Sequence, residues 1–143
     1  MTAGPLVVLG DALLDRDITG HARRLCPDAP APVVEQGRVR TRPGGAALAA
    51  LLAGAWASEV VLIAPFGDDA ASRTVLGLLP SAVTVIGLPL DGALQEKTRV
   101  MAGGRTLLRL DTPAPLPAPG HTAPASGHTA PGRGHAARTA PPP

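Results

Sequence analysis

The change of composition at Asp111 most constrains what this chain can fold into. All eleven acidic residues of the 143-residue sequence lie at or before Asp111, and nine of the seventeen prolines lie after it. A segment so rich in proline and so poor in large apolar residues cannot bury enough surface to fold. We therefore predict a folded unit over residues 1–111 and a disordered tail over residues 112–143. Roughly 110 residues can bury about two-thirds of their unfolded surface, which is enough for one small domain.

The charge and composition of the folded part exclude several classes of protein. Eleven basic residues balance the eleven acidic ones, and the only aromatic residues are Trp56 and Phe66, so we expect no nucleic-acid partner. Cys26 is the only cysteine, which rules out an intramolecular disulfide and fits a reducing compartment. No apolar run is long enough to span a bilayer, and the first residues lack the basic region of a signal peptide. We expect a cytoplasmic chain without a membrane partner.

The apolar runs predict an α/β fold. The run "PLVVLG" is continuous and rich in β-branched residues, so we predict a central parallel strand that is buried on both faces. Further strands are predicted at 58–67 and 81–90, and "QEKTRVMAGGRTLLRLD" predicts a hairpin that turns at Gly103-Gly104. A buried helix is predicted from Gly44-Gly45 to residue 57, and a second helix over 68–79 begins with acidic residues suited to a helix N-terminus. The remaining segment, 18–45, contains prolines and predicts short strands or loops.

The predicted tail carries a degenerate seven-residue repeat. Its three copies are "GHTAPAS", "GHTAPGR" and "GHAARTA", which place His121, His128 and His135 at regular intervals. A metal site is one interpretation of these histidines. We favour the other, that isolated histidines without neighbouring acids or thiols bind nothing specific.

Gly44-Gly45 lies at the start of a predicted helix, where free backbone N–H groups and the helix dipole can bind an anion. The segment lacks the Lys-Ser/Thr of a P-loop and the three-glycine pattern of a dinucleotide site. The pair therefore serves either a ligand or close packing, and the residues alone leave both open. Asp11 lies just beyond the first strand, where α/β sheets bind ligands; its carboxylate could accept two sugar hydroxyls or simply cap a turn.

The combined motifs resemble the ribokinase-like (PfkB) carbohydrate kinases over residues 5–111. Gly10-Asp11 with Asp15-Arg16, then "PDAPAPV", then "RPGGAA", follow in order and spacing the pattern of the heptose 7-phosphate kinase branch. The resemblance covers the amino-terminal part of that family's domain. It implies a partial ribokinase-like, Rossmann-like parallel sheet with flanking helices and a β-lid. It also implies ATP-dependent phosphoryl transfer to a hydroxyl of a sugar or sugar phosphate.

The resemblance assigns roles to individual residues. It implies that Asp11 holds sugar hydroxyls and that Gly44 and Gly45 form the backbone floor under the sugar. Asp15 and Arg16 belong to the same signature. No catalytic residue or metal ligand is assigned, and the residues we take as substrate-binding are Asp11, Asp15, Gly44, Gly45, Arg99 and Arg109.

The resemblance also implies a lid built from residues 18–36 and 96–111. In this branch the lid commonly forms a dimer contact, so a homodimer is one implied partner. Arg99 and Arg109 lie on the lid strands and could face the sugar or its phosphate. They are equally ordinary as solvated strand arginines.

Two departures from the family pattern bear on activity. The family places an asparagine three residues after the second glycine, where its amide binds the sugar, and this chain has Leu48 there. The loss of such a bond typically costs about 1–3 kcal/mol, so we expect weakened sugar binding. The family's catalytic aspartate, in a Gly-Ala-Gly-Asp-like segment of the carboxyl-terminal half, has no counterpart after Asp111.

The expected function is therefore that of a carbohydrate kinase-like protein that is inactive alone. The complete family domain binds ATP and Mg²⁺, and we expect this chain to hold neither, because phosphoryl transfer needs both reactants positioned together. The missing strands are expected to leave an uncovered sheet edge. Two alternatives remain: a non-catalytic sugar-binding or dimerisation module, and a frameshifted remnant without function.

Overall fold

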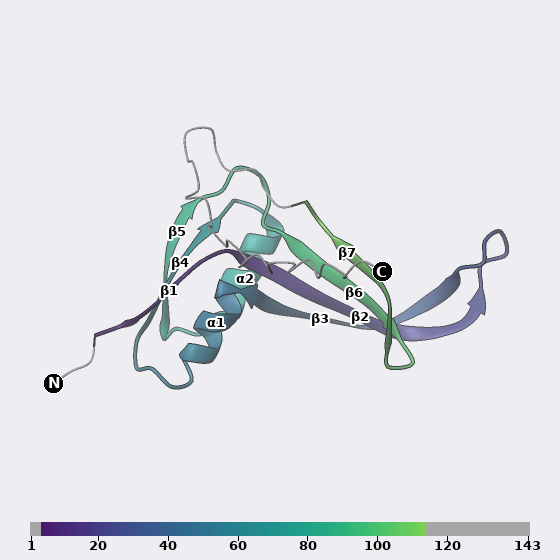
Figure 1. Cartoon of the computed structure of the whole chain (residues 1–143), viewed down its shortest axis with the longest axis horizontal. Coiled ribbons are helices and arrows are strands. Elements are labelled where there is room, and N and C mark those ends of the chain that lie inside the picture. The colour runs from purple at the N-terminus through teal and green to yellow at the C-terminus, as the bar shows by residue number, and fades with distance from the viewer. Residues whose placement is uncertain (1–3, 114–143) are drawn as a thin grey trace, which may run out of the picture.

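The computed structural model describes residues 4–113, which form two β-sheets and two helices (Figure 1). A parallel three-stranded sheet has the order β1-β4-β5, and a four-stranded sheet, here called the lid sheet, has the order β3-β2-β6-β7. The predicted tail and its three histidines lie outside the described residues, apart from Thr112 and Pro113. The elements are β1 (Leu6–Leu9), β2 (Ala12–Leu25), β3 (Pro32–Gly45), α1 (Ala46–Ala53), β4 (Val60–Phe66), α2 (Ala70–Leu78), β5 (Val83–Pro89), β6 (Glu96–Ala102) and β7 (Arg105–Asp111).

The hydrophobic core lies between the parallel sheet and the two helices. Alternate residues of β4 point to this side, as the two-residue period of a strand requires, and Val60, Leu62 and Ala64 are buried. The helices α1 and α2 cover them with small side chains and one valine. The helical members of the core are Ala47, Ala50, Ala71 and Val75. The predicted α/β class is confirmed.

The prediction that the first strand is central is wrong for the described residues. β4 occupies the centre of the three-stranded sheet, and β1 pairs only with β4. Leu9 of β1 is 72% exposed. A continuous apolar run indicates a strand suited to burial on both faces, but its place in the sheet depends on which other strands lie beside it.

The prediction of a fully buried first helix is also wrong in part. α1 buries Ala47 and Ala50, whereas Leu52 is exposed and Trp56, just beyond the helix, is 93% exposed. A helix that is apolar on all sides carries no pattern that distinguishes a buried face from a solvent face. Only one face of α1 has a partner among residues 4–113.

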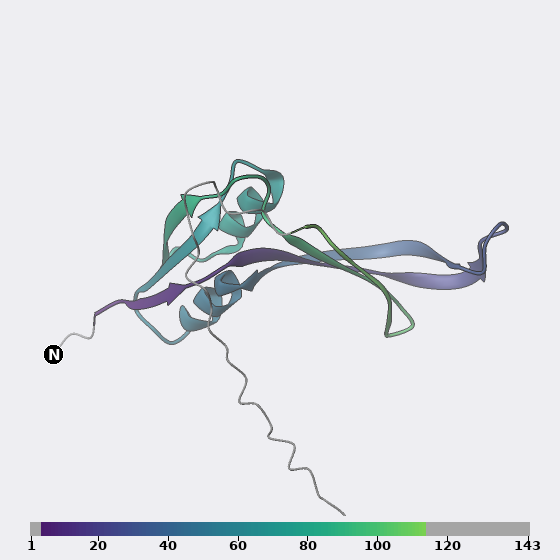
Figure 2. The same ribbon diagram turned by 45° about the horizontal axis from the view of Figure 1, so that its top comes forward.

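The segment predicted as short strands or loops instead forms most of a long hairpin. β2 and β3 have 14 residues each and pair antiparallel from Ala12 with Gly45 to Leu25 with Pro32 (Figure 2). The lid sheet therefore begins before residue 18 and extends to residue 45. β3 is an edge strand and pairs with a neighbour on one side only, so it tolerates proline. In an interior strand, a proline would remove a hydrogen bond from the sheet.

The hairpin at the end of the folded part is confirmed. β6 and β7 pair antiparallel, and Gly103 and Gly104 both have the positive φ, 57° and 74°, that a tight hairpin turn requires. β6 in turn pairs parallel with β2, which completes the lid sheet. No helix among residues 4–113 is long and apolar enough to cross a membrane.

Asp69 connects helix α2 to the segment that enters the lid. Its carboxylate accepts hydrogen bonds from the backbone N–H of Ala71 at 2.9 Å and of Ser72 at 3.0 Å, which cap the helix, and from the backbone N–H of Leu94 at 3.2 Å. The Ser72 hydroxyl donates a further bond at 2.6 Å. We expect Asp69→Ala to lower the free energy of unfolding by about 2 kcal/mol, because it removes the cap and leaves the Leu94 N–H unpaired. Urea titration measures this loss.

Acid should abolish the same contribution. Burial alone would raise the pKa of Asp69, but the hydrogen bonds from Ser72, Leu94 and Ala71 outweigh it and hold the pKa below its usual value. A carboxylate with a lowered pKa stabilises the fold above its unfolded-state pKa, about 3.9, and loses this effect as the pH falls through the folded-state pKa. The wild-type and Asp69→Ala curves should therefore converge in acid. The exposed neighbour Asp68 is the control, and Asp68→Ala should lower the free energy of unfolding by under about 0.5 kcal/mol. A loss as large as that of Asp69→Ala would contradict the role of the cap.

Candidate functional site

The candidate site lies where the parallel sheet meets the lid sheet. The chain passes from β1 into β2 through Gly10 and Asp11, and from β3 into α1 through Gly44 and Gly45. The two passages are adjacent, because the first residues of β2 pair with the last residues of β3. The backbone N–H of Ala46 donates to the carbonyl oxygen of Asp11 at 2.9 Å. Asp11 and the glycine pair, 33 residues apart in sequence, therefore share one junction.

The junction requires glycine at position 45 and is tightly packed at position 44. A Cβ on Gly45 would lie 2.3 Å from the carbonyl oxygen of Asp11, and the backbone of Gly45 has φ 58° and ψ −135°. A Cβ on Gly44 would lie 2.2 Å from Leu13 Cδ1 and 2.8 Å from Asp15 Oδ2. Gly44, which is buried, is thus next to the carboxylate of Asp15, and Gly45 is exposed beside it.

Four charged side chains form a network beside the glycine pair. Asp15, which is only 8% exposed, accepts a hydrogen bond from Arg99 at 3.1 Å and lies 3.8 Å from Arg42 Nε. Asp17 pairs with the same two arginines, with Arg42 through a hydrogen bond and with Arg99 at 3.4 Å. Each carboxylate therefore contacts both guanidinium groups.

The network favours the charged forms of Asp17 and Arg42. Burial alone would raise the pKa of Asp17, but the hydrogen bond and charge of Arg42, and then those of Arg99, outweigh burial and lower that pKa. The hydrogen bond to Asp17 raises the pKa of Arg42, against a smaller opposing effect of burial. Planar guanidinium groups held in this way have fixed directions, which suits the recognition of hydroxyl or phosphate oxygens.

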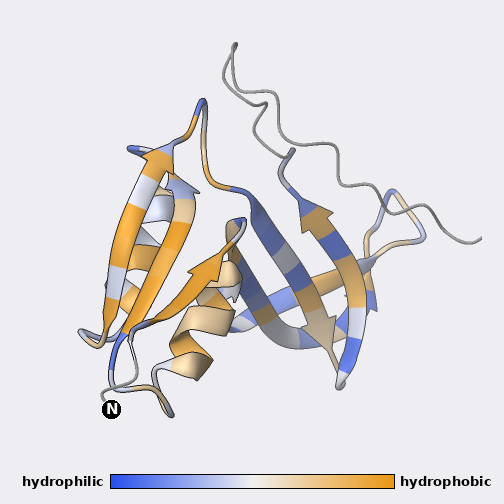
Figure 3. Ribbon diagram, turned by 60° about the vertical axis from the view of Figure 1, so that its left-hand side comes forward, coloured by the Kyte–Doolittle hydropathy of each residue, from blue (hydrophilic) through white to orange (hydrophobic). Residues whose placement is uncertain are grey.

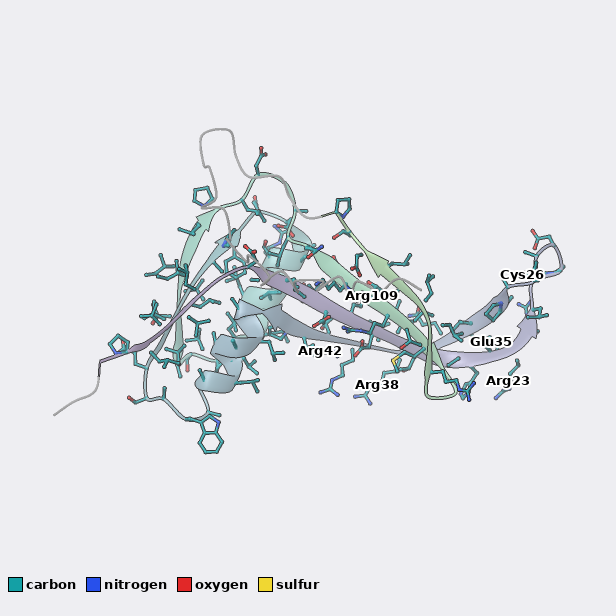
Figure 4. The ribbon with its side chains drawn as sticks, in the orientation of Figure 1. Arg23, Cys26, Glu35, Arg38, Arg42 and Arg109 are labelled. Atoms are coloured by element: carbon teal, nitrogen blue, oxygen red, sulfur yellow. The ribbon has the colours of Figure 1, made fainter. Side chains whose placement is uncertain are left out.

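The lid sheet has one charged and one apolar face. Residues paired across neighbouring strands share a face, so the register places six basic and three acidic side chains on the face of Asp15. This charged face consists of Asp15, Asp17, Arg38, Arg40, Arg42, Lys97, Arg99, Arg109 and Asp111. The other face, here called the apolar face, carries Ile18, Val39, Val100, Leu108 and Leu110, and near the junction also the ion pair of Arg16 and Glu96. Figure 4 shows Arg42 on the part of the lid near the helices, and Arg23, Glu35 and Cys26 at the far end.

Comparison with curated proteins relates this chain to proteins of one name. No protein-family model matches the chain. The bifunctional protein HldE of Streptomyces coelicolor is 57% identical over 107 residues, which are 75% of this chain and 23% of that protein. The bifunctional protein HldE of Gluconobacter oxydans is 40% identical over 113 residues, 76% of this chain and 23% of that protein. The chain thus spans less than a quarter of the length of these curated relatives.

Solved structures show the same fold. A carbohydrate kinase from Agrobacterium tumefaciens matches 77% of this chain and 36% of its own chain, with a TM-score of 0.63 and 24% identity. The ribokinase of Cryptococcus neoformans in complex with ADP matches 88% of this chain and 39% of its own, with a TM-score of 0.58 and 22% identity. In sequence and fold the chain is related to the ribokinase-like carbohydrate kinases. It covers part of their domain.

The structure places the residues expected to bind substrate in a ribokinase-like kinase at different distances from the glycine pair. Asp15 and Arg99 lie together beside it, and Asp11 is exposed at the junction itself. Arg109 is opposite Arg99 in the register but binds the carboxylate of Asp111, at 2.7 and 2.8 Å.

Two further residues named by the sequence lie outside the network of charged side chains. Arg16 is on the other face of the lid, where it binds Glu96 at 3.0 Å. Leu48 is the third residue of α1 and is half-buried.

Residue-by-residue reasoning missed Arg42 and Asp17. Both belong to short alternating patterns, "DRD" at 15–17, in which every second residue is acidic, and "RVRTR" at 38–42, in which every second residue is basic. Alternation of this kind is the sign of a strand with one charged face, and it was available from the sequence. The sequence did not show which charges pair with one another, because the two patterns lie on different strands.

The described residues do not fit the Mg²⁺ and nucleotide that ribokinase-like kinases use. Among residues 4–113 there is no group of three or more His, Cys, Asp or Glu side chains that could hold a metal. A recess of about 390 Å³ at the start of α2 is lined by the carboxylates of Asp69 and Glu96, which would repel a triphosphate. The groups described here are suited to the acceptor of the reaction rather than to the nucleotide.

Proposed function

We propose that this chain is the sugar-binding part of a carbohydrate kinase of the heptose 7-phosphate type. The observation that carries the proposal is the buried carboxylate of Asp15, held by Arg99 next to Gly44 and close to the exposed backbone of Gly45. A fixed carboxylate accepts hydrogen bonds from sugar hydroxyls, and a glycine floor lets a sugar ring approach the backbone closely. Asp11, at the same junction, would accept further hydroxyl bonds.

The charged face of the lid suits a phosphorylated sugar. Its basic side chains outnumber its acidic ones two to one, so it attracts anions. Arg99 is committed to Asp15 and Asp17, and Arg109 to Asp111, but each guanidinium has further N–H groups that can donate to a phosphate. The relationship to proteins called HldE supports a heptose phosphate among the possible sugars.

In this proposal the chain binds and orients the acceptor sugar but does not transfer a phosphoryl group by itself. Phosphoryl transfer requires the acceptor hydroxyl, the nucleotide and the metal to be positioned together. The chain covers 36% to 39% of the solved kinases it matches, and residues 4–113 contain no group of three or more His, Cys, Asp or Glu side chains that could hold Mg²⁺. ATP and Mg²⁺ would be held by parts of the domain outside the matched region.

Calorimetric titration tests the proposal. The purified chain should bind heptose 7-phosphate and hexose 6-phosphates more tightly than the unphosphorylated sugars, and the difference should shrink at high salt as charges are screened. A coupled assay with ATP should detect no phosphorylation of the same sugars. Equal or absent binding across the panel, or ATP-dependent turnover, would contradict the proposal.

Leu48→Asn is expected to strengthen sugar binding. In the family resemblance this position carries an asparagine whose amide binds the sugar, and Leu48 lies in the first turn of α1, next to the glycine pair. A restored hydrogen bond of about 1–2 kcal/mol corresponds to roughly 5- to 30-fold tighter binding. Leu52→Asn, at an exposed position one turn further along the same helix from the glycine pair, should leave the affinity unchanged. Equal gains in the two variants would show that the effect is not local.

A homodimer through the apolar face of the lid is part of the proposal. Val39, Leu108 and Leu110 are exposed there, and apolar patches on a lid are more often covered than solvated. We expect the chain to self-associate and Leu108→Asp to weaken this at least about 30-fold, because a charge would be buried at the contact. Light scattering over a concentration series measures it. Leu76→Asp, on α2, is the control, and a monomer at all concentrations would refute the contact.

A further inference from the structure

The outer face of the parallel sheet is the largest apolar surface that the proposed sugar site does not use. Residues of β4 that alternate with the buried ones point away from the helices, and their partners in β1 and β5 share that direction. The outer face, so defined, consists of Val7, Leu9, Val61, Ile63, Ile86 and Leu88. It contains no charged side chain.

Among residues 4–113 nothing covers this face. Val7, Leu9, Ile86 and Leu88 are exposed, whereas Val60 and Leu62 on the inner face are fully buried. Figure 1 shows both helices on the lid side of the sheet, and Figure 3, which brings the opposite side forward, shows hydrophobic strands there. Parallel sheets normally have both faces covered, and their strands then read as continuous apolar runs, as β1 and β4 do.

The edges of the same sheet are open within the described part of the chain. β1 and β5 each pair with β4 on one side only. β1 has the sequence LVVL, without the charged residue, bulge or internal proline that normally blunts an edge strand. An apolar face that continues into an unprotected edge suits a partner that both adds strands and packs helices on the face.

The share of the ribokinase-like fold that this chain contains indicates what covers the outer face. The chain covers 36% of the Agrobacterium kinase and 39% of the Cryptococcus ribokinase, so over half of the fold lies outside the match. We propose that the outer face docks a second polypeptide that carries the remaining strands and helices of a ribokinase-like domain. The proposal rests on the family relationship and the exposed face, and it is independent of whether the site binds a sugar.

Co-expression tests the docking directly. The full 143-residue chain is produced together with Streptomyces coelicolor HldE from which the 107-residue region matching this chain has been deleted. That probe lacks one side of its own sheet, so we expect it to be insoluble when produced alone. When the chain is present, we expect the probe to be soluble and to co-purify with the chain. Ile86→Asp should weaken the complex at least about 30-fold, since it would bury an unpaired charge in the contact.

A matched control separates this face from the lid. Leu108 is 50% exposed and Ile86 is 49% exposed, so Leu108→Asp introduces the same charge at the same exposure on a different sheet. Circular dichroism first establishes that both variants fold. Loss of the complex with Ile86→Asp and its retention with Leu108→Asp would support the docking face. A probe that stays insoluble with the wild-type chain, the reverse order of effects, or a second copy of this chain on the outer face would overturn it.

Discussion

Gly45→Ala is expected to lower the free energy of unfolding by about 3 kcal/mol or more, a large share of the stability of a small domain. The backbone of Gly45 has a positive φ with an extended ψ, a combination that side chains other than glycine essentially do not adopt. The new Cβ would also lie 2.3 Å from the carbonyl oxygen of Asp11. That carbonyl is fixed by the N–H of Ala46, so relief requires the first turn of α1 to move away from the lid.

Chemical denaturation monitored by circular dichroism measures the effect. Gly77→Ala is the matched control, because Gly77 is exposed within α2 and a Cβ there would meet nothing within 4 Å. In this control the free energy of unfolding should rise by up to about 1 kcal/mol, because alanine has a better helix propensity than glycine. If Gly45→Ala were as stable as the wild type, the close approach at the junction would be incorrect.

Asp15→Asn is expected to weaken the binding of a sugar phosphate about 10- to 100-fold, the range for one lost hydrogen bond to a charged group. The amide keeps the size of the carboxylate but offers one acceptor oxygen in place of two and carries no charge. Its oxygen lies next to Gly44, where a sugar ring would rest. Calorimetry with the best ligand of the panel measures the loss.

Asp17→Asn distinguishes sugar binding from a general loss of charge. Asp17 pairs with the same two arginines as Asp15, but lies two residues further along β2 from the glycine pair. This variant should therefore bind sugar phosphate nearly as well as the wild type. Equal losses in the two variants would mean that the arginine network, rather than contact with Asp15, governs affinity.

Much of the local structure was predictable because it depends on neighbours in the chain. The β-branched runs marked β4 and β5, and the acidic residues before "AASRTVLGLL" marked the start of α2, where Asp69 caps the helix. The two glycines of the last hairpin marked its turn. The length of β2 and β3 was missed, since prolines and glycines near a sheet edge look like loop residues to any local rule.

The candidate site was predictable in part. The family resemblance named Asp11, Asp15, Gly44, Gly45 and Arg99, and the structure brings these five to one junction or its immediate strand neighbours. It also named Arg16, whose side chain lies on the opposite face with Glu96. A motif records which residues recur together but not which face of a strand each one occupies, and one residue of shift reverses the face.

By itself the sequence determined the α/β class, the strands β4 and β5, the start of α2 and the glycine turn of the last hairpin, because these follow from side-chain shape and backbone freedom within a few residues. Only the tertiary structure decided which charges meet. Arg99 reaches Asp15 across 84 residues of sequence because β6 pairs parallel with β2. Only the structure, too, showed that within residues 4–113 β1 lies at an edge and one face of the parallel sheet has no covering element. Pairing and coverage depend on which elements compete for each surface, and no local pattern contains that information.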